Sequence, residues 1–170
     1  MWVDFLSVHN SNSEAERKKH MSTVRSPIKV DYVTSARRHL KDAHILMHSG
    51  RPANAGQLLG FTIECGLKAL LIASGIAPDP EGGIPRRHTF RQHMPTLNNA
   101  LVSSGHLIPD GPRAAHYQAM VPNVGALANW STDHRYFKES VMPLASLPQW
   151  ELAALEMNEM LDQAVIDGVM

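Results

Sequence analysis

Residues 52–74 read PANAGQLLGFTIECGLKALLIAS, and this stretch decides the fold. Its only charged side chains are Glu64 and Lys68, so a helix of this sequence is apolar nearly all round. Such a helix is normally buried in the middle of a bundle. We therefore expect it to supply the core through Leu58, Leu59, Phe61, Ile63, Leu67, Leu70, Leu71 and Ile72.

Proline and glycine mark the ends of this helix. Pro52 suits a first turn, and Gly75 is placed to adopt the left-handed conformation that commonly follows a helix. Gly56 and Gly60 lie four residues apart and would let another helix approach closely. We interpret this pair as a packing feature.

A helix and a long loop are predicted on either side of the apolar stretch. Asp31 is a suitable N-cap, apolar residues recur at helical spacing up to His48, and Gly50 ends this earlier helix. After the apolar helix, residues 76–88 are rich in proline and glycine and predict a loop longer than most connections within a bundle. Loops of this length often carry function.

The next helix contains Leu97 and stops at Gly105, but its start has two interpretations. Thr89 with Gln92 forms the pattern of a capping box, whereas Pro95 fits a first-turn position and would kink a helix that began earlier. A short irregular helix is expected around residues 114–120.

The last predicted helix opens at Ser146, with Gln149 as the partner in a second capping box. Its expected inner stripe is Trp150, Ala153, Met157, Met160, Leu161 and Ala164. The pattern as a whole predicts an all-α fold, a four- to five-helix bundle with a long loop between helices 2 and 3. We expect residues 1–29 to be a flexible N-terminal extension and residues 30–170 to form one domain.

The composition indicates in which cellular compartment the protein is found. The most apolar run is interrupted by Glu64 and Lys68, so we expect no membrane span. Cys65 is the only cysteine, which excludes an intrachain disulfide and favours a reducing compartment. The N-terminal apolar residues are interrupted by Asp4 and lack the continuous apolar centre of a signal peptide. The sequence therefore predicts a cytoplasmic protein.

The net charge is zero, but the charges are unevenly distributed. Residues 86–138 carry six Lys/Arg against two Asp/Glu, and residues 139–170 carry none against six. The middle segment is therefore a candidate surface for anions. The alternative is that it packs beside the acidic last helix through ordinary surface ion pairs.

The densest polar cluster stands where the long loop enters the next helix: Arg86, Arg87, His88, Arg91 and His93. Arginine matches phosphate oxygens with a planar fork, and histidine can transfer a proton near neutral pH. This combination suits binding or cleavage of a phosphodiester. A solvated basic loop without a ligand is the alternative.

Glu64 and Lys68 are four residues apart in an otherwise apolar helix, so each needs a polar partner if it is buried. They either satisfy one another, or Glu64 faces a functional site. We find no sequence motif for a metal or a cofactor, and we predict neither.

The order of these pieces resembles the HEPN family. The residues that carry the resemblance are Ala36 to Gly50, then Asn54-Ala55 up to Glu64-Cys65-Gly66-Leu67-Lys68-Ala69-Leu70-Leu71, then His88-Thr89-Phe90 leading to Leu97, and finally Arg135-Tyr136. The resemblance implies a helical bundle that is usually a homodimer. Its members include toxin ribonucleases of toxin–antitoxin systems, partners of nucleotidyltransferases, and modules that bind nucleotides.

Ribonucleases of that family carry an arginine followed, four to six residues on, by a histidine. Arg87 and His93 have this spacing here, although they precede the position that the active members use. No histidine follows Arg135-Tyr136 at the required distance, and Phe137 stands where a proline is often found. These departures favour a binding member over a nuclease.

Three hypotheses follow from the sequence. The first is a HEPN-like module that binds a nucleotide or RNA through Arg86, Arg87, His88, Arg91, His93, Arg135, Tyr136 and Glu64, with a nucleotidyltransferase-type antitoxin as its partner. The second is a metal-independent ribonuclease toxin in which Arg87 stabilises charge and His93 moves a proton. The third is a structural module that binds another protein and no nucleic acid.

Overall fold

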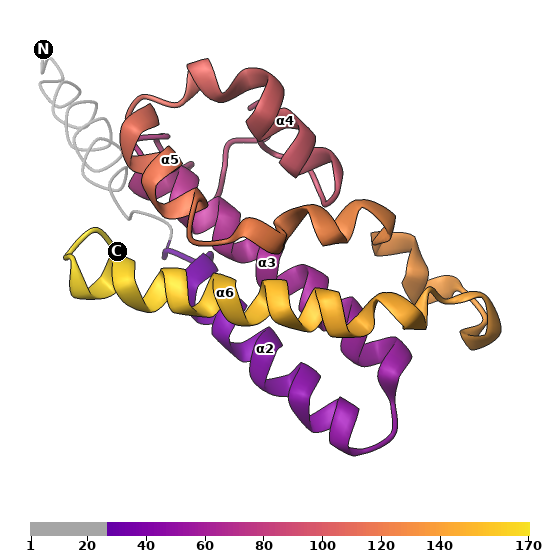
Figure 1. Cartoon of the computed structure of the whole chain (residues 1–170). Coiled ribbons are helices and arrows are strands. Elements are labelled where there is room, and N and C mark those ends of the chain that lie inside the picture. Colours follow the sequence, from indigo (N-terminus) through magenta and orange to yellow (C-terminus); the bar gives the residue numbers. More distant parts are fainter. Residues whose placement is uncertain (1–26) are drawn as a thin grey trace, which may run out of the picture.

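A computed structural model describes residues 27–170, in which all the regular elements are helices and no strand is present (Figure 1). The α-helices of this part are α2 (Tyr32–His48), α3 (Pro52–Ala73), α4 (Thr96–Ser104), α5 (Gly111–Gln118) and α6 (Leu147–Ile166). Its 3-10 helices are η1 (Gly105–Leu107), η2 (Pro122–Asn129), η3 (Thr132–Tyr136), η4 (Glu139–Val141) and η5 (Leu144–Ser146). The all-α prediction is confirmed, whereas the predicted flexible extension falls mostly on residues 1–26, outside the described residues.

Helix α3 is the central element. It contacts α2, α5, α6 and η3, and α6 crosses it in Figure 1. Most of the residues predicted for its core are fully buried, and the remaining three, Leu58, Phe61 and Ile72, are half-buried at the edge of the core. The predicted end is also confirmed, since Gly75 follows the helix with a φ of +99°.

By length and composition alone, α3 would be able to cross a membrane. In the fold, however, 78% of its most apolar window is buried against the rest of the protein. Burial of that extent is typical of the core helix of a bundle.

Two of the glycines of α3, Gly56 and Gly60, each accept a tryptophan. At Gly56 the ring of Trp150, from α6, lies 3.0 Å from the place where a Cβ would be, so the expected close approach of a helix is found there. At Gly60 the neighbour is the indole of Trp130, which follows η2 and comes so close that a Cβ would overlap it. The Nε1 of Trp130 donates to the carbonyl oxygen of Gly56 at 3.0 Å, which fixes the indole across this part of α3.

The predicted starts of α2 and α4 can be compared with the structure. Helix α2 begins after Asp31, whose carboxylate accepts from the Thr34 N–H at 2.9 Å as expected of an N-cap. Helix α4 begins after Pro95, so the alternative start at Thr89 is wrong.

Helix α6 does begin after Ser146, but the predicted capping box is wrong. The Ser146 hydroxyl oxygen accepts from Asn129 instead, at 2.8 Å, and makes no bond to the first turn of α6. The inner stripe predicted for this helix is completely buried.

Substitution of Gly60 by alanine tests the packing of Trp130. Because the added methyl group would overlap the indole, Gly60→Ala is expected to lower the free energy of unfolding by about 1–3 kcal/mol. The matched control is Gly125→Ala, where nothing lies within 4 Å of the new atom and the change should stay within about 0.5 kcal/mol. Urea unfolding of both variants measures the difference, and equal stability would show that Trp130 does not pack on Gly60.

Candidate functional site

A buried carboxylate in the middle of α3 organises the candidate site. Glu64 is only 5% exposed. Its Oε1 accepts from the Nζ of Lys68 at 2.7 Å, and its Oε2 accepts from the backbone N–H of Met94 at 3.2 Å. The Nδ1 of His93 lies 2.9 Å from Oε1 and 3.1 Å from Oε2. Three donors from two segments of the chain therefore converge on one buried anion.

The hydrogen bond between Glu64 and His93 sets the orientation of the imidazole. An ionised carboxylate only accepts hydrogen bonds, so Nδ1 must carry the hydrogen. The second ring nitrogen, Nε2, is then left to interact with a ligand. The His93 side chain is 67% exposed, so a solvent-facing imidazole is held by a buried acid. A histidine oriented in this way by a carboxylate is a common arrangement for a general base.

Lys68 shares the burial of Glu64, and its side chain is only 9% exposed. The expected pairing of the two side chains is confirmed, whereas a functional role of Glu64 stays a prediction. Glu64 pairs with Lys68 within α3, and it also faces the histidine of the candidate site. Removing either charge alone would leave the other buried without its partner.

The arginines of the preceding loop have different environments. Arg86 and Arg87 occupy the centre of a turn closed by a bond from the His88 N–H to the Pro85 carbonyl at 2.9 Å. Both side chains are exposed, and neither forms an ion pair with the residues that the structure describes. Arg87 lies six residues and Arg86 seven residues before His93, and both side chains are available to an anion.

Arg91 and His88 have structural contacts instead. The Nη1 of Arg91 donates to the Ile84 carbonyl at 2.6 Å and lies 3.5 Å from the carboxylate of Asp79. The ring of His88 packs 5.4 Å from that of Phe90, which is fully buried. Two of the five residues predicted as a phosphate site therefore hold the loop in shape.

Asp79, whose carboxylate lies beside Arg91, also stabilises the loop. The backbone N–H of Gly83 donates to Asp79 at 2.9 Å, and this bond is the main cause of a pKa below the usual value for Asp79. The N–H of Glu81 and the positive charges of Arg91 and Arg86 act in the same direction. The loop is thus held around an ionised carboxylate.

Arg135 and Tyr136 come from η3, a segment that is far away in sequence from His93 and contacts α3. The amide of Gln57 donates to the Thr132 carbonyl at 3.5 Å and so joins η3 to α3. Gln57 and Glu64 are seven residues apart, nearly two full turns, which places them on one face of α3 about 10 Å apart along its axis. The structure therefore aligns η3 with the Glu64 site along that face.

The side chains of η3 include a basic and aromatic pair. The guanidinium carbon of Arg135 lies 4.7 Å from the centre of the Tyr136 ring, a cation–π contact. Tyr136 is 74% exposed. A flat surface with a positive charge is therefore open to solvent at this position.

Three further residues lie next to Glu64 and had not been predicted for the site. His39 of α2 packs on Phe61, with ring centroids 5.6 Å apart, and burial followed by the charge of Arg38 lowers the pKa of His39. Burial raises the pKa of the Cys65 thiol to about 11, so this thiol stays neutral and is a poor nucleophile. Helical spacing from Glu64 would have pointed to Phe61, and Cys65 is its neighbour in the chain, but no sequence signal pointed to His39.

No family model, curated protein or solved structure matches this chain.

A double-mutant cycle tests the coupling of the buried charges. Glu64→Gln leaves the Lys68 ammonium buried without its counter-charge and should lower the free energy of unfolding by about 3 kcal/mol. Adding Lys68→Met removes the orphaned charge and should restore a large part of the loss. Denaturant unfolding of both single variants and the double variant measures this, and additive losses would contradict the pairing.

The buried histidine of η3, His134, predicts that the stability of the fold depends on pH. His134 is 8% exposed, packs on Trp150 with ring centroids 6.1 Å apart, and has no partner for Nδ1 among the described residues. Burial lowers its pKa from the ordinary value of 6.5, so the unfolded chain binds this proton more readily and stability falls as the pH drops through 6.5. His134→Leu should therefore lose less stability between pH 7.5 and pH 5 than the wild type in thermal unfolding. Identical losses would contradict this prediction.

Proposed function

We propose that this protein is a HEPN-like module that binds RNA along the face of α3 between His93 and Tyr136 and cleaves it without a metal. His93 is the group that moves a proton, and Glu64 is its positioning residue. The observation that supports this proposal best is the hydrogen bond between His93 Nδ1 and the buried Glu64, which leaves Nε2 of an exposed ring directed away from the carboxylate.

The chemistry that fits such a group is transfer within the RNA chain itself. His93 Nε2 accepts the proton of a ribose 2′-hydroxyl while the 2′-oxygen forms a bond to the adjacent phosphorus. The bond from phosphorus to the 5′-oxygen breaks, and that oxygen takes a proton from water. The products are a 2′,3′-cyclic phosphate end and a 5′-hydroxyl end. Neither oxidant nor metal is needed.

The charges around His93 supply the phosphate contacts. Arg87 and Arg86 are exposed and form no ion pair within residues 27–170, and a guanidinium stabilises the charge that builds on phosphate oxygens. Arg135 and Tyr136, further along the face, suit a neighbouring nucleotide, since arginine and aromatic rings stack on unpaired bases. Arg91 contributes indirectly because it holds the loop to Ile84 and Asp79.

RNA binding without cleavage is the second candidate. It is favoured by the absence of a histidine four to six residues after Arg135, where the active members of the resembled family have one. A homodimer, a nucleotidyltransferase-type antitoxin and a cytoplasmic location stay predictions of the sequence.

The test is cleavage of a single-stranded RNA by the purified protein in excess chelator, with the products identified by their ends. We expect cyclic-phosphate products, and we expect no cleavage of the same strand carrying 2′-O-methyl groups, which lacks the attacking hydroxyl. His93→Ala should lower the rate by about 100-fold or more, and Arg87→Ala by about 10- to 100-fold. Glu64→Gln should lower the rate while RNA affinity is kept.

Matched controls separate the site from a contaminating nuclease and from loss of charge in general. His106→Ala and Arg51→Ala remove exposed residues of the same types elsewhere on the protein and should leave the rate unchanged. RNA that binds but is not cleaved would contradict the nuclease and favour the second candidate. RNA that does not bind would overturn both and favour a module for protein interaction.

A further inference from the structure

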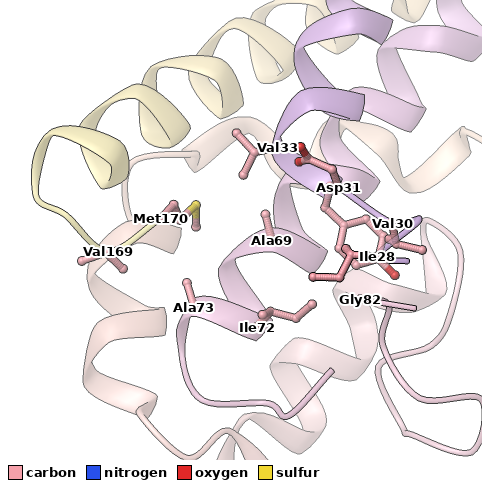
Figure 2. A pocket seen from close by; sticks show the side chains of 11 residues that line it. Ile28, Val30, Asp31, Val33, Ala69, Ile72, Ala73, Gly82, Val169 and Met170 are labelled. Atoms are coloured by element: carbon pink, nitrogen blue, oxygen red, sulfur yellow. The ribbon is translucent and has the colours of Figure 1, made fainter. Parts of the chain in front are cut away.

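An apolar pocket of about 330 Å³ lies between the start of α2, the last turns of α3 and the end of the chain. Figure 2 shows its walls meeting from these separate segments. The lining residues are Ile28, Val30, Asp31, Tyr32, Val33, Ala69, Ile72, Ala73, Gly82, Val169 and Met170. Its size is at the lower end of the range for small-molecule sites, so it fits a short ligand.

Among the side chains that line the pocket, that of Asp31 is the charged one, and it is negative. The other lining side chains are uncharged, and the hydroxyl of Tyr32 is engaged by the Ile84 N–H at 3.1 Å. The carboxylate of Asp31 stands beside Val33 in Figure 2. A bond from the Thr34 hydroxyl, at 2.6 Å, is the main cause of a lowered pKa for Asp31.

Two nearby cations among the described residues are paired elsewhere. Lys29 donates to Glu81 at 2.7 Å, and Arg37 donates to Asp162 at 2.6 Å. Asp31 itself forms no ion pair within residues 27–170. Each carboxylate oxygen accepts a single bond from Thr34 and has capacity for another donor.

A second negative feature lies on the opposite wall. Ala73 is the last residue of α3, and the carboxyl end of a helix carries the negative end of its dipole. Part of this end is engaged, since Arg113 donates to the Ala73 carbonyl at 2.7 Å. Within residues 27–170 the pocket thus combines apolar walls with a carboxylate that forms no ion pair, and no basic residue of this range lines it.

We propose that this pocket binds a small amphiphilic amine, a short aliphatic chain that ends in a primary ammonium group. The chain occupies the space between Val33, Ile72 and Met170, and the ammonium group donates to the carboxylate of Asp31. A fatty acid is disfavoured because its carboxylate would meet Asp31 without a counter-charge. The site is separate from the His93 surface and does not depend on the proposed ribonuclease activity.

The probes are n-hexylammonium, 1-hexanol and hexanoate, which share a chain and differ in the head group. Each is titrated into the full chain, and binding is followed by NMR from the methyl groups of Met170, Val169 and Ile28. We expect saturable shifts of these methyls with hexylammonium, weaker shifts with hexanol and none with hexanoate.

Two variants locate the interaction. Asp31→Asn keeps an N-cap residue for α2 but removes the charge, so hexylammonium affinity should fall by about fivefold, towards that of hexanol. Asp42→Asn, an exposed position of α2 outside the pocket, is the matched control and should change nothing. Ala73→Leu adds a branched chain in the pocket and should abolish binding; if it does not fold, Asp31→Asn with its control still decides.

Three results would overturn the proposal. Equal binding of hexylammonium and hexanol, with no effect of Asp31→Asn, would exclude recognition of the charge. Binding that persists in folded Ala73→Leu would place the amine elsewhere. Absence of saturable shifts at the pocket methyls with every probe would show that the pocket is not a ligand site.

Discussion

The carboxylate of Glu64 is the constraint on which the site depends. A charge in the middle of a core helix is costly unless donors surround it, and Glu64 has three, from Lys68, His93 and the Met94 N–H. Two of these donors belong to the segment that leads into α4. The same bonds that satisfy the buried acid therefore attach this segment to α3 and determine where the His93 ring points.

The packing of η2 and η3 on α3 adds a second polar segment to the surface near Glu64 and His93. Gly56 and Gly60 of α3 let the indoles of Trp150 and Trp130 pack directly on the helix. Trp130 stands between η2 and η3, so its packing attaches both segments to α3. Because Gln57 and Glu64 share one face of α3, the segment with Arg135 and Tyr136 is aligned with His93 although more than forty residues separate them in sequence. A polar surface is thus built along the edge of an apolar core helix.

The main features of the fold could be predicted because they depend on local patterns. The apolar run of α3, the N-cap at Asp31 and the glycine after α3 are local signals, and each led to the correct element. The two predicted capping boxes failed for a different reason. Ser146 met Asn129 from another segment, and the segment at Thr89 was held in turns by contacts with the loop, so tertiary contacts overrode the local preference.

The candidate site could be predicted only in part. The sequence identified Glu64, Arg87 and His93 as candidate polar residues of the site. It did not predict that the Glu64 carboxylate would bind the His93 ring, 29 positions along the chain, together with Lys68. Nor does composition distinguish Arg87, which forms no ion pair with the residues that the structure describes, from Arg91, which is held by a carbonyl 2.6 Å away. Such pairings depend on how the loop folds back on α3, and periodicity carries no information about that.

The most direct test of the account is the protonation pattern of the His93 ring, measured by ¹⁵N NMR of the histidine side chains at neutral pH. We predict that Nδ1 carries the hydrogen in the neutral ring, and that Glu64→Gln changes the His93 signal more than any other histidine signal. A ring with its hydrogen on Nε2, or one that does not respond to Glu64→Gln, would contradict the claim that the buried carboxylate orients this histidine.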